Sequence, residues 1–413
     1  MLGIIGLGYV GLPLALLSAK KGISTIGFDI DKNKIESLAK GKVYVELDYA
    51  EDWYNEAKDN FTATDNPEML KDCNIKIICV PTPVHADKKP DFSPLISATE
   101  LVAKQMQNND LIIVESTISP GTMETKVKPI LDAAGKEYYL AHCPERIDPG
   151  NKLYNVANIP RVVGGIDVTS TKLAAQFYRS IIPETIMEMS SLKAAEATKI
   201  TENAFRDINI GFVNEIAMIY DELGIDILEV LEGAKTKPFS FLAHYPGIGV
   251  GGHCIPVDPY YLIDTAKEMG LNPKLMITAR EINTGMAEHA INLFEEQKDK
   301  IGLKSPKIAL LGIAYKQDVE DDRESPYYEV QKLLEKKNYE IISHDPFFPD
   351  KSTYKSVEET LKNSDCIIII TAHSEYRKMK IPDNIKIVID GRNILNPEEL
   401  TSRKICYRGI GRK

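Results

Sequence analysis

The sequence predicts an α/β protein in which two doubly wound, Rossmann-like domains flank an all-helical connector. Short apolar runs alternate with amphipathic helical patterns over residues 2–165, strand signals stop between about 190 and 296, and the alternation returns after Ser305-Pro306. Continuous apolar runs separated by helices are typical of parallel sheets covered on both faces. A chain of 413 residues also exceeds what one hydrophobic core normally serves. We expect domains at 1–187, 188–296 and 297–413.

In the first domain, strands are expected at 3–7, 25–28, 75–80, 111–115 and 138–141, with helices at 12–20 and 32–40. A long helix is expected at 191–224, because Gly224 can close it in the left-handed conformation. Its apolar residues leave apolar surface on more than one side, so the helix is either buried or forms a dimer; by analogy with the fold, we expect a homodimer or higher homo-oligomer through this helix. The last domain should hold strands at 307–312, 341–343, 366–371 and 385–390, with helices at 327–336 and 357–361.

Composition and charge exclude several classes of partner. The chain is 43% hydrophobic and 27% charged, which is ordinary for a soluble globular protein. Its formal net charge of -10 argues against nucleic acid or an anionic membrane surface, because both require a basic partner. The first residues form a strand pattern and no long apolar stretch is present, so we expect a cytoplasmic protein.

The first expected strand ends in Gly6-Leu7-Gly8-Tyr9-Val10-Gly11, a dinucleotide-binding pattern. Gly6 permits the tight turn, Gly8 lets a pyrophosphate approach the backbone, and Gly11 allows close packing of helix on strand. Asp29 ends the second strand, where a carboxylate accepts hydrogen bonds from ribose hydroxyls and repels a 2′-phosphate, which favours NAD over NADP. A plain tight turn with Asp29 capping the next helix is the alternative, and Lys34 could reach the ribose or be a surface lysine.

Thr82 and Thr117 follow two further expected strands, at Val80-Pro81-Thr82-Pro83 and Glu115-Ser116-Thr117. Ligands in such sheets lie beyond the carboxyl ends of the strands, so both threonines are candidate contacts on the nicotinamide side. Either could instead be a helix cap or a turn hydroxyl.

Cys254 differs from the other five cysteines. No C-x-x-C pair is present, so neither a metal site nor a disulfide framework is expected, and the other five lie in apolar, strand-like runs. Cys254 ends a loop with four glycines in six residues, ahead of a helical stretch that can favour a thiolate. Asp258 would return to the thiol if the segment turns helically. A bend with an incidental thiol is equally compatible, and His253 could orient the thiol, contact the ligand or be structural.

On the long helix, Lys199, Asn203 and Arg206 lie at spacings of four and three and should share a face. A lysine beside an asparagine suits an oxyanion or a hydroxyl awaiting deprotonation. The alternative is a solvated face on which Glu196 pairs with Lys199.

Polar motifs also follow strands elsewhere. In His142-Cys143-Pro144-Glu145-Arg146, Glu145 could act as a base for water or only pair with Arg146. In the last domain, Lys316 and Arg323 flank a helix start that suits the phosphates of UDP. The final expected strand is also followed by a polar motif, Asp390-Gly391-Arg392-Asn393.

Seven motifs in order resemble the UDP-glucose/GDP-mannose dehydrogenase family across essentially the whole chain: GLGYVGLPLA, VPTP, the Glu-Ser-Thr strand end, CPER, the helix with Lys199 and Asn203, GGHCIPVDP, and AYK with DDRESP. The resemblance implies a four-electron oxidation of a sugar C6 hydroxyl that uses two NAD, for polysaccharide or glycan biosynthesis. It implies Cys254 as the nucleophile that holds the aldehyde, Lys199 and Asn203 at the oxyanion, Asp258 beside the catalytic water, and Glu145 as the base for thioester hydrolysis.

The resemblance also implies binding roles. Cofactor contacts are expected at Gly6, Gly8, Tyr9, Val10, Gly11, Asp29, Lys34, Thr82, Thr117 and Arg323, with Thr117 also counted among the catalytic residues. Substrate contacts are expected at Glu145, Arg146, Ile147, Lys199, Asn203, Arg206, Tyr245, Gly247, Gly251, His253, Tyr315, Lys316 and Arg392.

Three departures from the UDP-glucose branch bear on the sugar. His253 and Val257 stand where that branch has Ser and Lys, and Arg146 follows Pro144-Glu145; all three resemble the UDP-N-acetylhexosamine branch. The segment 237–241 resembles N-acetylglucosamine enzymes, because N-acetylmannosamine enzymes usually show an Arg near Ser240. UDP-N-acetylglucosamine is therefore the expected substrate, ahead of UDP-N-acetylmannosamine and UDP-glucose. A two-electron hydroxyacid dehydrogenase and a non-enzymatic NAD sensor are the competing classes.

Overall fold

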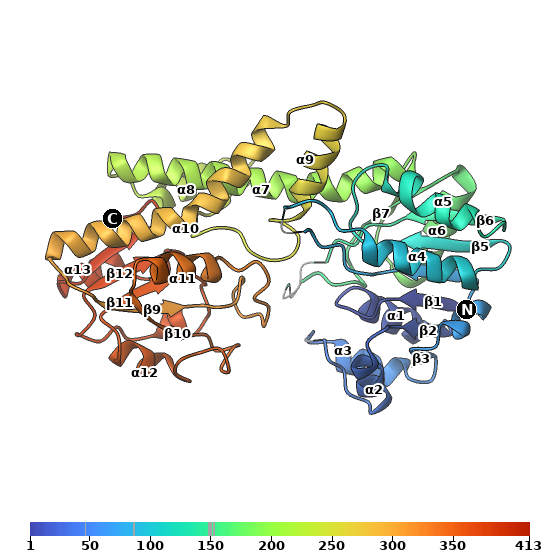
Figure 1. Cartoon of the computed structure of the whole chain (residues 1–413), viewed down its shortest axis with the longest axis horizontal. Coiled ribbons are helices and arrows are strands. Elements are labelled where there is room, and N and C mark those ends of the chain that lie inside the picture. Colours follow the sequence, from blue (N-terminus) through green and yellow to red (C-terminus); the bar gives the residue numbers. More distant parts are fainter. Residues whose placement is uncertain (46, 86, 148–150, 152) are drawn as a thin grey trace. The chain divides into compact units, whose positions relative to one another are not determined.

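The computed structural model describes residues 1–45, 47–85, 87–147, 151 and 153–413. The chain divides into two compact units, one formed by Met1–Glu202 and Tyr260–Leu271, the other by Asn203–Pro259 and Asn272–Lys413 (Figure 1). The boundary falls inside the long helix α7, Leu192–Leu223. Each unit is built on its own sheet.

The sheet of the first unit has the order β3-β2-β1-β4-β5-β6-β7-β8, which begins as the Rossmann order. All neighbours are parallel except β6 and β7. β1 and β4 are parallel, but the order in which the chain adds strands reverses between them, so the crevice beyond their carboxyl ends is the place for a ligand. The strands are β1 Leu2–Ile5, β2 Thr25–Phe28, β3 Phe61–Thr64, β4 Ile75–Ile78, β5 Asp110–Val114, β6 Tyr138–His142, β7 Arg161–Gly165 and β8 Ile186–Glu188.

Helices cover both faces of this sheet. Ile77 and Ile113 contribute to the core under α1, α3 and α6, whereas Ile78 and Ile112, their neighbours along the strands, contribute to the core under α4 and α5. The helical elements are α1 Gly11–Lys20, α2 Lys32–Ala39, α3 Ala50–Ala57, the 3-10 turn η1 Pro67–Asp72, α4 Ser93–Gln105, the π-helical turn η2 Met123–Val127, α5 Lys128–Asp132 and α6 Val168–Ile181. The doubly wound architecture that the sequence predicts is confirmed.

Three strands of this sheet were missed in the sequence. β3 is buried only at its two ends, β7 contains two glycines and an arginine, and β8 has three residues. None forms the continuous apolar run that marks a central strand, because β3 and β8 lie at the sheet edges.

The second unit contains a five-stranded, fully parallel sheet of order β10-β9-β11-β12-β13. Helices α10 and α11 cover one face and α12 the other (Figure 1). The elements are α8 Ile227–Lys235, α9 Asp258–Glu268, α10 Lys274–Ile301, β9 Lys307–Leu311, α11 Pro326–Lys336, β10 Glu340–His344, α12 Val357–Lys362, β11 Cys366–Ile369, η3 Tyr376–Lys378, β12 Ile387–Asp390, α13 Pro397–Ser402 and β13 Cys406–Gly409; α9 continues into the first unit.

Helix α7 buries several polar side chains beside its apolar ones and leaves some apolar side chains exposed. Its buried polar residues are Glu196, Lys199, Asn203, Asp207, Asn214 and Asp221. Phe205, Phe212 and Ile219 recur every seven residues on the exposed side. Within the described residues, no helix is both long and apolar enough to cross a membrane.

Candidate active site

The loop after β1 has the geometry of a phosphate-binding turn. Gly6 has φ +96°, and a Cβ on Gly11 would lie 1.9 Å from the Gly6 carbonyl oxygen. The fold therefore excludes a side chain at both positions. A Cβ on Gly8 would meet no atom within 4 Å, so the backbone there is open to a ligand. Helix α1 begins at Gly11, and its N-terminus favours negative charge.

Asp29 lies buried at the end of β2, and its carboxylate accepts three hydrogen bonds. One carboxylate oxygen accepts from the Leu7 amide at 2.8 Å and from Lys34 Nζ at 2.9 Å, and the other accepts from the Asp31 amide at 2.9 Å. Asp31 caps α2 by accepting from the Asn33 amide. The alternative in which Asp29 caps that helix is therefore wrong, and Lys34 pairs with Asp29 instead of facing solvent alone. The carboxylate keeps lone pairs for ribose hydroxyls.

Tyr44 closes over the same loop, although no sequence motif marks it as a site residue. Its hydroxyl donates to the Leu7 carbonyl at 2.6 Å, and Lys34 Nζ lies 5.9 Å from its ring centroid. Burial and the nearby Asp29 carboxylate raise the pKa of Tyr44. No local motif predicts the Tyr44–Leu7 hydrogen bond, because the two residues lie 37 positions apart in the sequence.

The loops after β4 and β5 lie side by side at the ligand edge of the sheet. Ser116 Oγ donates to the Val80 carbonyl at 2.7 Å, and the Tyr261 hydroxyl donates to the Thr82 carbonyl at 2.8 Å. Thr82 is buried and Thr117 is half-buried. Thr82 thus follows β4 and Thr117 follows β5, at the strand ends that the sequence predicted.

Glu145 follows β6 and is nearly buried, with 9% of its surface exposed. Its carboxylate accepts from the Ile147 amide. Arg146 does not pair with it: the guanidinium contacts Glu202 at 2.5 Å and donates to the Pro160 carbonyl at 3.0 Å. The interpretation in which Glu145 serves only as the partner of Arg146 is therefore wrong, and its carboxylate stays available for chemistry.

A buried ion pair that the sequence analysis did not foresee supports this strand end. Arg161 Nη1 lies 2.9 Å from Glu115 Oε1, and the Tyr178 hydroxyl donates to the same oxygen at 2.6 Å. Burial raises the pKa of Glu115, and Arg161 opposes that rise. The Glu145 amide donates to the Glu115 carbonyl at 3.3 Å, so the pair lies directly behind the candidate base.

Cys254 is exposed, whereas four of the other cysteines are buried and Cys406 is intermediate. The Asp258 amide donates to the Cys254 carbonyl at 2.8 Å, the spacing of one helical turn. The segment therefore turns helically into α9, as the sequence analysis required for Asp258 to return toward the thiol. Asn203 Nδ2 donates to Asp258 Oδ2 at 2.5 Å, so α7 contacts the start of α9 next to the Cys254 loop.

The glycines before Cys254 allow close contact with the C-terminal sheet domain. Cβ atoms on Gly251 and Gly252 would lie 2.6 and 2.7 Å from the Tyr315 side chain, and one on Gly247 would lie 2.5 Å from Arg392 Nη1. Tyr315, Arg392 and this loop, which the sequence predicts as substrate contacts, thus pack together.

Two cations of this region have protein partners. Arg323 Nη2 lies 2.6 Å from Asp321 Oδ2, and its carbonyl accepts from the Gly252 amide at 2.9 Å. Burial, and secondarily Arg323, lower the pKa of His253. Arg392 Nε donates to the Ile370 carbonyl at 2.9 Å, and burial lowers the pKa of its guanidinium. Lys316 is half-buried in the loop after β9.

On α7, Lys199 and Asn203 are buried at 7% and 5% exposure. Glu196 accepts from the amides of Gly121 and Met123, at 2.6 and 2.8 Å, so the solvated Glu196–Lys199 pair is not what forms. Arg206 is exposed, and Asp207 continues the buried face in its place. Arg206 and Asp207 lie three and four residues after Asn203, so spacing alone could not tell which of the two is buried.

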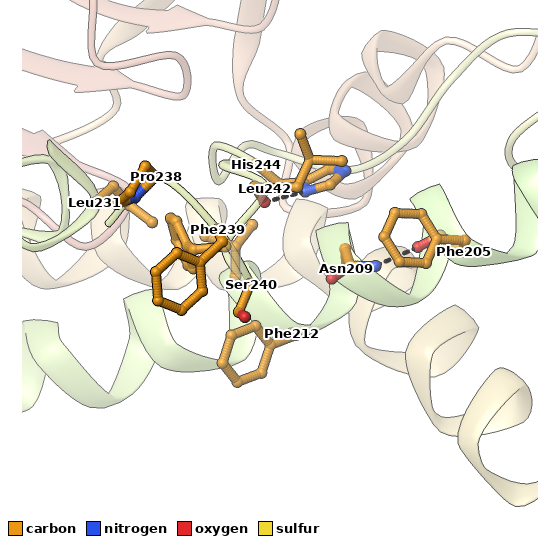
Figure 2. Close-up of a pocket in the computed structure, with 11 residues that line it drawn as sticks. Phe205, Asn209, Phe212, Leu231, Pro238, Phe239, Ser240, Leu242 and His244 are labelled. Carbon is orange, nitrogen blue, oxygen red and sulfur yellow. Dashed lines mark hydrogen bonds between the residues drawn. The ribbon is translucent and has the colours of Figure 1, made fainter. Parts of the chain in front are cut away.

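Tyr245 is anchored at the far end of the glycine loop, where its hydroxyl donates to Glu232 Oε1 at 3.0 Å. The preceding segment forms one wall of a pocket of about 640 Å³. Figure 2 shows Phe205, Asn209 and Phe212 of α7 on the other side, facing the segment that carries Phe239, Ser240 and Leu242. Ser240 has φ +65°.

Together, the open glycine turn, the buried ribose-type carboxylate and the second parallel sheet define a nucleotide-dependent α/β protein. The chain belongs to the UDP-glucose/GDP-mannose dehydrogenase family. Its residues 1–182 match the family's NAD binding domain, 193–285 its central domain and 309–397 its UDP binding domain. The predicted family, fold and cofactor are thereby confirmed.

Individual relatives agree over the full length. A UDP-N-acetyl-D-mannosamine dehydrogenase of Pyrococcus horikoshii is 35% identical over 100% of this chain and 99% of the relative. A UDP-N-acetyl-D-glucosamine 6-dehydrogenase of Pseudomonas aeruginosa is 35% identical over 91% of each. The solved structure of a UDP-D-ManNAc dehydrogenase from P. horikoshii superposes with a TM-score of 0.93, covering 100% of this chain and 99% of that one, at 35% identity.

Proposed function

We propose that this protein oxidises the C6 hydroxyl of a UDP-N-acetylhexosamine, UDP-N-acetylglucosamine, to the carboxylate, with two NAD consumed per sugar. The observation that carries the proposal is the exposed Cys254 thiol, one helical turn from an Asp258 carboxylate that Asn203 holds, in a chain of this dehydrogenase family. A two-electron dehydrogenase would have no use for such a thiol.

In the first half-reaction the C6 hydroxyl gives its proton to the water that Asp258 orients, its carbon gives up a hydride, and an aldehyde is left. Lys199, buried on α7, stabilises the developing oxyanion together with the amide of Asn203. The Cys254 thiolate then adds to the aldehyde carbon and forms a thiohemiacetal. NAD, held by Asp29 and the open backbone at Gly8, would supply the hydride acceptor in each half-reaction.

The second hydride leaves the thiohemiacetal carbon and gives a thioester. Water attacks this thioester, the carbon–sulfur bond breaks, and the products are the carboxylate and the free thiolate. Glu145 takes the proton of that water, and Asp258 orients it. The buried Arg161–Glu115 pair fixes the backbone on which Glu145 lies.

The binding roles are assigned from the family resemblance, and the geometry of the Gly8 turn and of Asp29 supports the cofactor part. Asp29 receives the adenine ribose, and the open backbone at Gly8 receives the pyrophosphate. Lys316, Tyr315 and Arg392 serve the UDP-sugar in the C-terminal domain, and Arg323 serves the cofactor.

The choice of sugar depends on the segment 237–241. Ser240 stands where N-acetylmannosamine enzymes usually show an Arg, which favours UDP-N-acetylglucosamine. UDP-N-acetylmannosamine is the second candidate, supported by the P. horikoshii relative of that name, which is as similar to this chain as the glucosamine relative. The two sugars differ only in the configuration at C2, a difference that few contacts report.

A substrate panel tests the proposal. NADH formation is measured with UDP-GlcNAc, UDP-ManNAc, UDP-GalNAc and UDP-glucose, and the NADH released per sugar is counted to completion. We expect two NADH per UDP-GlcNAc and the highest kcat/KM for that sugar. One NADH per sugar would identify a two-electron dehydrogenase, and equal or better rates with UDP-glucose would refute the branch assignment.

A cysteine pair tests the covalent step. Cys254→Ala should abolish acid formation, whereas Cys406→Ala, at a half-buried cysteine in the last strand, should retain it. Acid formation by Cys254→Ala at the wild-type rate would exclude the thiohemiacetal route and would favour a protein that uses NAD without covalent chemistry.

We also propose that the exposed side of α7 pairs two copies of the chain. Phe205, Phe212 and Ile219 repeat every seven residues and are each about half exposed. A seven-residue apolar repeat is the seam by which helices pair, and a twofold pair needs one self-complementary patch. Phe212→Lys should lower the mass measured by light scattering from dimer to monomer, whereas Met187→Lys, at an exposed apolar site on β8, should not. An unchanged mass would remove α7 from the interface.

A further inference from the structure

A chain of buried polar side chains connects α7 and α10 to the loop that carries Cys254. Asn214 Oδ1 accepts from the Gly247 amide at 3.0 Å, and Asn214 Nδ2 donates to Asn283 Oδ1 at 2.9 Å. Asn283 Nδ2 donates to Asp207 Oδ1 at 2.8 Å, and Arg280 Nη1 contacts the same oxygen at 2.6 Å. This series of hydrogen bonds thus extends from the buried Arg280–Asp207 ion pair to Gly247, the first residue of the glycine loop.

These residues are shielded from water. Asn214 and Asp207 are fully buried, and Asn283 and Arg280 are exposed by 1% and 7%. A buried amide that loses its hydrogen-bond partner is destabilising, so each link constrains the position of its neighbour. The helices approach closely enough to form the links, since a Cβ on Gly211 would lie 3.1 Å from the Ala279 Cα.

The loop is bonded to Asn214 at this end and passes close to the backbone of Asn283. A Cβ on Gly249, which has φ +132°, would lie 3.3 Å from the Asn283 carbonyl oxygen. The Ile248 side chain between them is buried in the core. Asn214 therefore fixes Gly247, and the backbone of Asn283 limits the path at Gly249, five residues before Cys254.

We propose that Asn214 and Asn283 are positioning residues for Cys254. Neither is among the predicted cofactor or substrate contacts; they set the position of the glycine loop and hence the approach of the thiolate to the aldehyde carbon. The inference deepens the proposed function and rests on it. A thiolate displaced by about 1 Å can lose on the order of 100-fold in rate, because covalent capture requires a near-attack geometry.

Three variants test the proposal. Asn214→Leu keeps the volume but leaves the Gly247 amide without its acceptor, and Asn214→Asp keeps an acceptor. Asp221→Asn breaks another buried ion pair of α7, with Arg408, which does not reach the loop. We expect Asn214→Leu to lower kcat more than tenfold per folded molecule, with KM for NAD changed less than threefold. Asn214→Asp should lose less, and Asp221→Asn should keep the wild-type kcat whatever its Tm.

A second readout does not depend on turnover. Cys254 is the exposed cysteine, so its alkylation by iodoacetamide in the native protein, followed by mass spectrometry, reports the position of the thiol. We expect the alkylation rate of Asn214→Leu to differ from wild type by at least about threefold, with Asp221→Asn unchanged. Wild-type kcat and alkylation rate in Asn214→Leu would overturn the proposal, as would equal kcat losses in Asn214→Leu and Asp221→Asn. If Cys254→Ala retained acid formation, the proposed function would fail while the alkylation result still decided the positioning role.

Discussion

Asn203 and Asp258 lie 55 residues apart in the chain, and the amide of the first donates to the carboxylate of the second at 2.5 Å. Both side chains are at least 95% buried. The bond therefore fixes the orientation of a carboxylate that can scarcely be reached by bulk water, one helical turn after an exposed thiol.

Removal of this donor should harm chemistry more than binding. Asn203→Ala leaves the Asp258 carboxylate without its charge-assisted bond and removes a candidate oxyanion donor, so we expect kcat to fall by about 100-fold or more. KM for NAD should change little. The measurement is the steady-state rate of NADH formation with UDP-GlcNAc. Asn209→Ala, on the same helix, is the control; a similar loss in both variants would assign the effect to α7 as a whole.

Asp29 should determine cofactor choice. Asp29→Asn removes the charge that repels a 2′-phosphate, so we expect KM for NAD to rise about tenfold and the preference for NAD over NADP to shrink. Asp31→Asn is the matched control, because asparagine caps helices as well as aspartate does. Initial rates over a range of both cofactors measure the effect. A preference that is unchanged in Asp29→Asn would place the ribose elsewhere.

Gly8 and Gly11 should respond oppositely to the same methyl group. Gly11→Ala would put a Cβ 1.9 Å from a backbone oxygen, so we expect a clear fall in Tm or no soluble protein. Gly8→Ala meets open space, so its Tm should equal that of wild type while its affinity for NAD falls by about tenfold. Thermal unfolding and NAD titration separate the two effects. Normal NAD affinity in Gly8→Ala would contradict the pyrophosphate assignment.

His142 should make the protein sensitive to acid. Burial lowers its pKa to about 3, whereas an unfolded histidine titrates near 6.5. The unfolded state therefore binds more protons below pH 6.5, and stability falls as the pH drops from 6.5 toward 3. At pH 5 the loss from this group should be about 2 kcal/mol relative to pH 7.5.

His142→Met removes that titration. We expect the difference in the free energy of unfolding between pH 5 and pH 7.5 to shrink by about this amount in urea titrations. His85→Gln, at a side chain with 59% exposure, should leave the difference unchanged. An identical pH dependence in His142→Met and wild type would show that other groups control acid stability.

The sequence by itself determined the class of fold, the cofactor turn and the family. Those properties depend on local patterns, such as apolar runs with intervening helices and three glycines at fixed spacing, which survive without knowledge of long-range contacts. It also singled out Cys254, because a thiol in a glycine-rich loop stands apart from thiols in apolar strands.

Only the tertiary structure decided which polar residues of α7 are buried and which groups they contact. The spacing placed Arg206 beside Lys199 and Asn203, but Asp207 is the buried neighbour, and Glu196 holds backbone amides instead of Lys199. Asn214, Asn283, Tyr44 and Arg161 carry no motif at all. Their roles depend on partners dozens of residues away, because a buried polar group is explained by what the fold brings to it and not by its neighbours in the chain.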